Sequence, residues 1–215
     1  MFWASASIRS GVYLKAFCRE NTADKVVYLT FDDGPVAEST SAVLDVLRSR
    51  GAAATFFIIG SNISGNERLI LRMIDGGYGI GIHSWSHAGT FPLYSVRRMA
   101  GDIGRCRAAL EALAGRKVDL FRPPFGVVNL LVAGAVKLCG LRTVGWSVRS
   151  FDTMNCGSPT WKEDVLDRIM RHVEPGAVIL LHDRLPEAAS LLSSLLDRLG
   201  AEGYRFDRPL PLLDR

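Results

Sequence analysis

The sequence Val-Val-Tyr-Leu-Thr-Phe-Asp-Asp-Gly-Pro, residues 26–35, contains the pattern from which the fold can be predicted. Residues 26–31 are apolar apart from one threonine, and such a run is typical of a strand buried on both faces. The Asp-Asp-Gly-Pro sequence that follows favours a turn. Similar short runs of apolar, β-branched or aromatic residues occur at 54–59, 79–82, 119–121, 142–148 and 176–181, with a weaker candidate at 204–206.

Longer stretches with a helical spacing of apolar residues separate these strands. In residues 39–50, Val43, Leu44 and Leu47 recur at this spacing, and Gly51 follows as a helix C-terminal signal. Further helices are expected at 66–75, 96–113, 130–138, 161–173 and 187–202. Strands that alternate with helices predict an α/β domain with a parallel sheet. Because no internal repeat or proline-rich linker divides the chain, residues 26–215 are assigned to one domain, and residues 1–25 to an N-terminal segment of unpredicted structure.

The composition excludes some classes of protein. The 215 residues are 48% hydrophobic and 22% charged, which lies in the range of soluble globular proteins. A formal net charge of +4, without any run of five like charges, does not indicate nucleic acid as a partner. No stretch approaches the roughly 20 apolar residues of a membrane helix, which excludes an integral membrane protein. Arg9 and Lys15 interrupt the start of the chain, so we expect no secretory signal and a cytoplasmic protein, unless a leader has been removed.

The four cysteines lie far apart in the sequence and form no Cys-x-x-Cys pair; they are Cys18, Cys106, Cys139 and Cys156. This spacing argues against a zinc ribbon and against a dense disulfide framework. We therefore expect free thiols, most of them buried.

Ionisable residues follow five of the predicted strands. In parallel α/β folds the functional residues gather in the loops that leave the carboxyl ends of the strands. Three of the four histidines occupy such positions, whereas His172 lies within a predicted helix and is interpreted as an ordinary helix residue. The residues at strand ends are Asp32, Asp33, His83, His87, Arg122, Asp152 and His182.

His83 and His87 are four residues apart and could present two imidazoles to one cation. A bare pair at this spacing is more often a pair of surface histidines, or of histidines bonded to neighbouring serines. Asp33 would complete a set of two histidines and one carboxylate, which leaves positions on a metal ion open for water and substrate. The alternative for Asp32-Asp33 is an ordinary turn that leads into a helix.

Asp32 and His182 are candidates for proton transfer. Adjacent residues that leave a strand point in different directions, so Asp32 could act as a base beside a ligand at the next position. Arg122, followed by two prolines, could orient Asp32 and hold it ionised; the alternative is a surface arginine in a turn. His182 ends an apolar strand, and Asp152 could orient it as a general acid. A core histidine with satisfied hydrogen bonds is the alternative for His182.

Four motifs occur in a fixed order, namely Thr30-Phe31-Asp32-Asp33-Gly34, His83-Ser84-Trp85-Ser86-His87, Arg122-Pro123-Pro124-Phe125-Gly126 and Leu180-Leu181-His182-Asp183. In this order they resemble the motifs of the polysaccharide deacetylases, also called the NodB homology domain or carbohydrate esterase family 4, over residues 26–213. The resemblance implies a single-domain distorted (β/α) barrel of the TIM type, with seven or eight strands that need not close the circle.

The resemblance also implies roles for these residues. A divalent metal ion would be held by Asp33, His83 and His87, with zinc as the first choice and cobalt, nickel or manganese as alternatives. Asp32 would be the catalytic base, His182 the general acid and Arg122 the group that braces the base. The backbone N–H of Phe125 would help to bind the oxyanion.

Two departures from the family pattern stand out. Phe125 replaces the usual tyrosine, which leaves a backbone donor unchanged. The fourth motif, usually Asp, two residues, Asp and Trp, reads Arg149-Ser150-Phe151-Asp152-Thr153. Asp152, which would tune His182, is kept, but Arg149 and Thr153 change the shape and charge of the expected substrate groove.

The function that the resemblance implies is the metal-dependent removal of N-acetyl groups from glycans that contain N-acetylglucosamine, such as chitin oligomers or peptidoglycan. A carbohydrate is therefore the expected partner. The alternatives are an esterase that removes O-acetyl groups from xylan, a deformylase of sugar-linked lipids, and a carbohydrate-binding module without catalytic activity.

Overall fold

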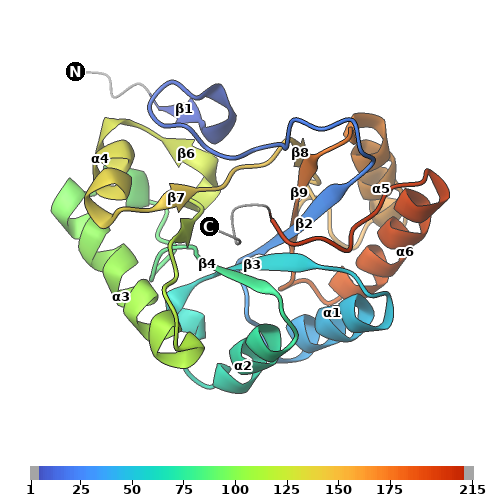
Figure 1. Ribbon diagram of the computed structural model, residues 1–215, viewed down its shortest axis with the longest axis horizontal. Helices are drawn as coiled ribbons and strands as arrows, with labels where there is room; N and C mark the ends of the chain where they lie inside the picture. Colours follow the sequence, from blue (N-terminus) through green and yellow to red (C-terminus); the bar gives the residue numbers. More distant parts are fainter. Residues whose placement is uncertain (1–4, 211–215) are drawn as a thin grey trace.

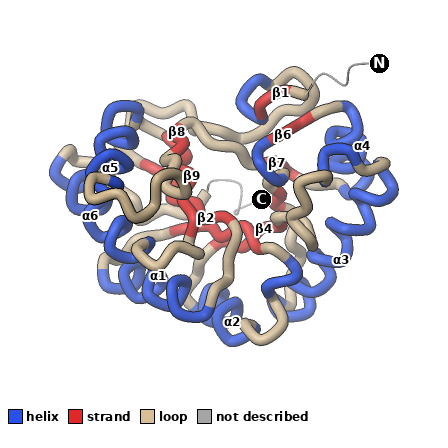
Figure 2. Tube along the Cα trace, turned by 180° about the vertical axis from the view of Figure 1, so that it is seen from behind, coloured by secondary structure: helices blue, strands red, loops and turns tan. Residues whose placement is uncertain are grey.

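Parallel strands form a curled sheet in the computed structural model, which describes residues 5–210. The helices lie on the outside of this sheet, as both views show (Figures 1 and 2). The strand order is β7-β5-β4-β3-β2-β9-β8, and every pair in the sheet is parallel. The prediction of a distorted (β/α) barrel is therefore confirmed. The strands are β2 (Val27–Asp32), β3 (Ala54–Ile58), β4 (Gly79–Ile82), β5 (Leu120–Phe121), β7 (Arg142–Thr143), β8 (Val148–Arg149) and β9 (Ala177–His182).

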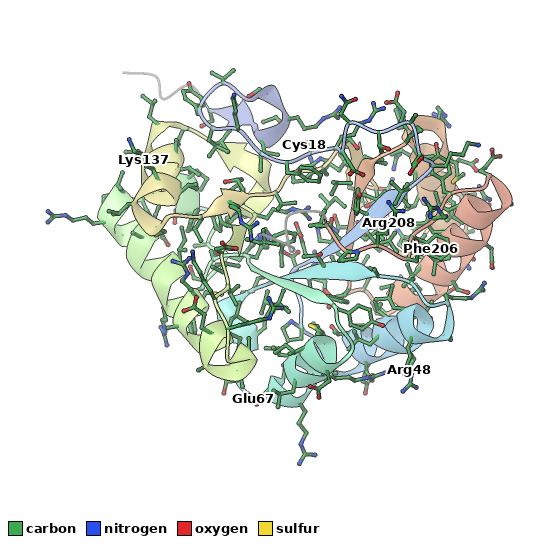
Figure 3. All side chains as sticks on the ribbon, in the orientation of Figure 1. Cys18, Arg48, Glu67, Lys137, Phe206 and Arg208 are labelled. Atoms are coloured by element: carbon green, nitrogen blue, oxygen red, sulfur yellow. The ribbon has the colours of Figure 1, made fainter. Side chains whose placement is uncertain are left out.

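All six predicted helices are present, with ends within a few residues of the expected positions. Their apolar residues form the contact with the sheet; in α6, for example, five leucines are buried, whereas its last turn carries the partly exposed Arg198. Charged side chains such as Arg48, Glu67 and Lys137 lie on the outer surface (Figure 3). The helices are α1 (Ala37–Ser49), α2 (Glu67–Asp75), α3 (Val96–Ala114), α4 (Leu130–Cys139), α5 (Trp161–His172) and α6 (Ala188–Ala201). Short 3-10 helices occur at η1 (Ile8–Ser10), η2 (Gly60–Asn62), η3 (Phe91–Leu93) and η4 (Pro124–Gly126).

The predicted strand at 142–148 is wrong, because this stretch forms two short strands at opposite edges of the sheet. β7 pairs with β5, whereas β8 pairs with β9. Only residues 144–147 connect the two strands. The sheet is therefore curled so strongly that four residues span the distance between its edges. The weaker candidate at 204–206 contributes one isolated bridge between Val26 and Arg205 and is not a strand of the sheet.

The N-terminal segment lies across the gap between the two edges. β1 (Ala6–Ser7) pairs with β6 (Val127–Val128) in a separate antiparallel sheet, and the chain then runs from β7 towards β9 (Figure 1). The Phe17 N–H donates to the Thr143 carbonyl at 2.9 Å, and the Glu20 N–H donates to the Gly176 carbonyl at 2.9 Å. These bonds satisfy the carbonyl of Thr143 in the edge strand β7 and that of Gly176 just before β9.

The four cysteines are free, as predicted, but the expectation that most are buried is wrong. Cys106 is buried, Cys18 and Cys139 are partly exposed, and Cys156 lies in an exposed loop. None of the helices within residues 5–210 is long and apolar enough to cross a membrane.

Candidate active site

The sheet brings six of the predicted residues to one cavity of about 600 Å³ at the carboxyl ends of its strands. β2 and β9 are neighbours in register, so that Asp32 lies directly beside His182. Arg122 and Asp152 are completely buried and support this cavity from behind. All eight predicted residues are therefore brought together. Those that line the cavity are Asp32, Asp33, His83, His87, Phe125 and His182.

Asp33, His83 and His87 form a group that could hold a metal ion, since one donor atom from each lies within 4.8 Å of the others. The Asp33 Oδ1 is 3.5 Å from the Nε2 of His83 and 3.5 Å from the Nε2 of His87. In a tetrahedral zinc site with bonds of about 2.1 Å, donor atoms lie about 3.4 Å apart. The two distances from the Asp33 carboxylate to the imidazoles thus match the spacing of ligands on one such ion.

Both imidazoles are prepared to act as ligands. The Nδ1 of the buried His83 is 2.7 Å from the backbone carbonyl of Arg122, which fixes the proton on Nδ1 and leaves the lone pair of Nε2 for a metal. Burial, assisted by the neighbouring His83, lowers the pKa of His87 to about 4. His87 is therefore neutral at physiological pH, as a metal ligand must be.

The turn that carries the two histidines is held by Asp102 of α3, a residue that the sequence analysis missed. The Asp102 carboxylate accepts from the Trp85 N–H at 2.6 Å and from the Ser86 hydroxyl at 2.9 Å. Ser84 and His87 both have positive φ angles, 67° and 45°, which are costly for residues other than glycine. Hydrogen bonds from a neighbouring helix can offset this cost. No local sequence signal marks Asp102, because it lies 15 residues beyond the turn in a helix.

Arg184 is the second residue that the sequence analysis missed. Its Nε donates to the Oδ2 of Asp33 at 3.0 Å, while the Oδ1 of Asp33 faces the two imidazoles. Burial alone would raise the pKa of Asp33, but the charges of His83, His182 and His87 and the bond from Arg184 lower it below its ordinary value. Asp33 is therefore ionised and directed towards the candidate metal site. The signal for Arg184 was its place directly after the His182-Asp183 motif.

Asp32 is paired with Arg122 as predicted. The Arg122 Nη1 donates to the Asp32 Oδ1 at 2.7 Å and to the Thr30 hydroxyl at 3.0 Å. The second carboxylate oxygen of Asp32 lies 3.7 Å from the Nε2 of His83, beside the candidate metal site. Arg122 therefore occupies one oxygen of Asp32 and leaves the other directed at the cavity. A surface arginine is ruled out, because Arg122 has no exposed area.

His182 is oriented by Asp152, as predicted. The His182 Nδ1 is 2.7 Å from the Asp152 Oδ1, and the backbone N–H of His182 donates to the Oδ2 at 2.8 Å. The Ser150 hydroxyl adds a third bond to this carboxylate, at 2.8 Å. Burial alone would lower the pKa of His182, but the hydrogen bond and charge of Asp152 raise it above its ordinary value. The Nε2 of His182 lies 3.9 Å from the Oδ2 of Asp33, one of the candidate metal ligands.

Asp183, the next residue, is buried behind the site and not in it. Its Oδ2 accepts from the Thr40 hydroxyl at 2.6 Å, and its Oδ1 has no hydrogen-bond partner among the described residues. Burial raises the pKa of Asp183 to about 7. A Cβ atom on Gly34 would lie 2.2 Å from the Asp183 Oδ2, so only glycine fits between the first motif and this carboxyl.

Phe125 lies at the rim of the cavity, with its ring centroid 4.6 Å from that of His87. Its backbone has a φ of 60°, and Gly126 follows with a φ of 65°. A Cβ atom on Gly126 would lie 2.2 Å from the ring of Trp146. The packing of Gly126 on Trp146 thus fixes the backbone beside Phe125, whose N–H is the predicted oxyanion donor.

Comparisons with known proteins agree with this geometry. The family model described as polysaccharide deacetylase matches residues 19–144. The chain is 34% identical to the peptidoglycan-N-acetylglucosamine deacetylase PgdA of Listeria monocytogenes, over 85% of this chain and 38% of that protein. It is 32% identical to the peptidoglycan-N-acetylmuramic acid deacetylase PdaA of Bacillus subtilis, over 89% of this chain and 72% of that protein.

The fold is likewise similar to that of solved deacetylases. The polysaccharide deacetylase Bc1974 from Bacillus cereus superposes with a TM-score of 0.79 at 28% identity, over 87% of this chain and 93% of that chain. The chain spans less than two fifths of the length of PgdA. The family match, the relatives and the ordered motifs around the cavity together show that the chain belongs to the polysaccharide deacetylase family.

Proposed function

We propose that the protein is a metal-dependent hydrolase that removes N-acetyl groups from glycans containing N-acetylglucosamine, such as peptidoglycan or chitin oligomers. One observation carries this proposal. A single cavity contains the candidate metal ligands, a carboxylate paired with a buried arginine, and a histidine paired with a buried aspartate. Several relatives bear the names of peptidoglycan deacetylases, which agrees with this activity.

Asp33, His83 and His87 would hold the metal ion. Two imidazoles and one carboxylate suit zinc, with cobalt, nickel or manganese as alternatives. When bound, such an ion lowers the pKa of a water ligand to about 7 and polarises a carbonyl oxygen.

The other side chains divide the proton transfers between them. The free oxygen of Asp32 takes the proton of the attacking water as the water oxygen bonds to the acetyl carbon. The N–H of Phe125 donates to the oxygen of the acetyl group as negative charge develops on it. His182 gives its proton to the nitrogen as the C–N bond breaks. The products are acetate and a free amine on the sugar, and Asp152 keeps His182 protonated before the bond breaks.

The alternative functions would use the candidate base, acid and metal ligands to different extents. An O-acetyl esterase or a deformylase would need the same base, acid and metal ligands, and a substrate panel separates these from an N-deacetylase. A module that only binds carbohydrate would not need Asp32, Arg122 and His182 in one cavity, because binding requires no proton transfer.

Acetate release tests the proposal. Purified protein with added zinc is incubated with N-acetylglucosamine oligomers, with peptidoglycan and with acetylated xylan, in the presence and absence of a chelator. We expect release from an N-acetylated glycan that the chelator abolishes and zinc restores. Asp32→Asn should abolish turnover and keep zinc, whereas the exposed control Asp75→Asn should change neither. Chelator-resistant turnover, or loss of zinc in Asp32→Asn, would contradict the assigned roles.

A further inference from the structure

Arg149 lines the same cavity as the candidate catalytic residues and forms no ion pair with any described residue. It is the last residue of β8, at the carboxyl edge of the sheet. The other two arginines next to the candidate catalytic residues are already neutralised, since Arg122 is paired with Asp32 and Arg184 with Asp33. Among residues 5–210, Arg149 is therefore the cation at this cavity that is available to a ligand.

Aromatic rings hold Arg149 in place. Its guanidinium carbon lies 4.6 Å from the centroid of the Phe151 ring and 5.8 Å from that of the buried Trp146 ring. An arginine stacked on aromatic faces keeps its N–H edge free, and this planar edge matches a carboxylate bidentately. These contacts restrict the conformations of the exposed Arg149 side chain before a ligand arrives, which reduces the entropy cost of binding.

The surroundings of Phe151 add to the positive charge. Arg168 approaches the same ring at 5.3 Å and donates to the Ser150 carbonyl at 3.1 Å, and it too has no carboxylate partner among the described residues. Phe151 has a φ of 57°, an unfavourable conformation for an aromatic residue. Two guanidinium groups and a strained backbone are thus gathered around one ring, and an anion bound nearby would relieve the repulsion between the two cations.

We propose that Arg149 binds a carboxylate of the substrate glycan, so that the enzyme prefers an acidic N-acetylated glycan to a neutral one. This inference rests on the proposed deacetylase function and deepens it. Carboxylates occur in two places on such glycans, as a lactyl ether on the acetylated sugar itself, or as a uronic acid on the neighbouring sugar. Both offer the planar anion that the free edge of Arg149 fits.

Two matched pairs of oligosaccharides test the proposal. One pair alternates N-acetylglucosamine with N-acetylmuramic acid, with the lactyl group either as the carboxylate or as its amide. The other alternates N-acetylglucosamine with glucuronic acid, either ionised or as its methyl ester. With zinc-loaded wild-type protein we expect kcat/KM to be about 10-fold higher for the charged member of one pair, which is about 1.4 kcal/mol. The pair that shows the difference identifies the position of the carboxylate.

The variants Arg149→Gln and Arg149→Lys complete the design. Arg149→Gln should reduce the ratio of charged to neutral kcat/KM to about one, and Arg149→Lys should give an intermediate ratio, because lysine keeps the charge but loses the planar edge. The exposed control Arg116→Gln should keep the wild-type ratio. Equal rates for charged and neutral substrates in the wild type, or an equal loss for both in Arg149→Gln, would overturn the proposal and leave Arg149 with a packing role only.

Binding measurements separate this proposal from the proposed function. Calorimetry of the same four oligosaccharides with zinc-loaded Asp32→Asn protein needs no turnover. A preference for a carboxylate in this variant supports the role of Arg149 even if no acetate is released by the wild type. If all four bind equally, or none binds, the proposal fails whatever the enzyme hydrolyses.

Discussion

Arg122→Met should destabilise the protein strongly, because the Arg122 side chain holds both the candidate base and the segment that connects the two edge strands, β7 and β8. The buried guanidinium makes four hydrogen bonds. Two go to the side chains of Asp32 and Thr30, at 2.7 and 3.0 Å, and two to the carbonyls of Val144 and Gly145, at 3.2 and 2.8 Å. Both carbonyls belong to the segment that passes from β7 to β8. Methionine fills similar space but bonds to none of these groups.

The expected magnitude follows from the burial of the pair. Removing one partner of a buried ion pair costs about 3–5 kcal/mol, because the other charge remains without compensation. In a domain of this size each kcal/mol lowers Tm by about 2–4 °C, so Tm should fall by about 6–20 °C. The double variant Asp32→Asn/Arg122→Met should recover part of this loss, since a neutral amide is easier to bury alone.

Urea and thermal unfolding of the wild type, the two single variants and the double variant measure this effect as a double-mutant cycle. We expect a coupling free energy of about 2 kcal/mol or more between Asp32 and Arg122. If Arg122→Met does not fold, Arg122→Lys supplies the same comparison with a smaller loss, because it keeps the charge. A loss below about 1 kcal/mol, or additive effects in the cycle, would refute the argument that this pair is a buried and coupled unit.

Three further predictions concern residues around the cavity. Asp152→Asn should shift the alkaline limb of the pH–rate profile to lower pH, because Asp152 raises the pKa of His182. The double variant Asp152→Asn/His182→Ala should be no slower than His182→Ala alone. Additive losses of rate would mean that the two residues act separately. Asp102→Ala should weaken zinc binding by about 10–100-fold, measured in competition with a chelator. Asp102→Asn should keep most of the affinity, since the amide oxygen can still accept from the Trp85 N–H. Equal losses in both variants would mean that the charge of Asp102, and not the geometry of the turn, determines zinc affinity. The pKa of Asp183 is about 7 in the folded protein, whereas its ordinary value is 3.8. Between these two values the folded state keeps a proton that the unfolded state loses. The stability of the wild type should therefore fall as the pH rises from about 4 to about 7. The Tm of Asp183→Asn relative to wild type should therefore rise over this window and level off above it, and a constant difference would show that Asp183 is already ionised.

Six helices, the main strands and the candidate catalytic residues were predictable from the sequence, because they depend on local patterns. An apolar run that stops at Asp-Asp-Gly-Pro marks both a strand and the place where its polar residues emerge. The strand at 142–148 could not be predicted correctly, because the sequence Arg-Thr-Val-Gly-Trp-Ser-Val has the same β-branched composition whether it pairs at one edge or divides between two. Strand pairing over long separations determines that difference, and periodicity carries no information about it.

The sequence by itself therefore determined the class of fold and the order of the motifs, and it supplied the eight candidate site residues. Only the tertiary structure decided how these residues meet. The pairing of β2 with β9 places Asp32 beside His182, although 150 positions separate them along the chain. The same folding brings Asp102 to the histidine turn, Arg184 to Asp33 and the unpaired Arg149 to the cavity. These contacts depend on the curvature and register of the sheet, which arise from the packing of the whole chain and from no single segment of it.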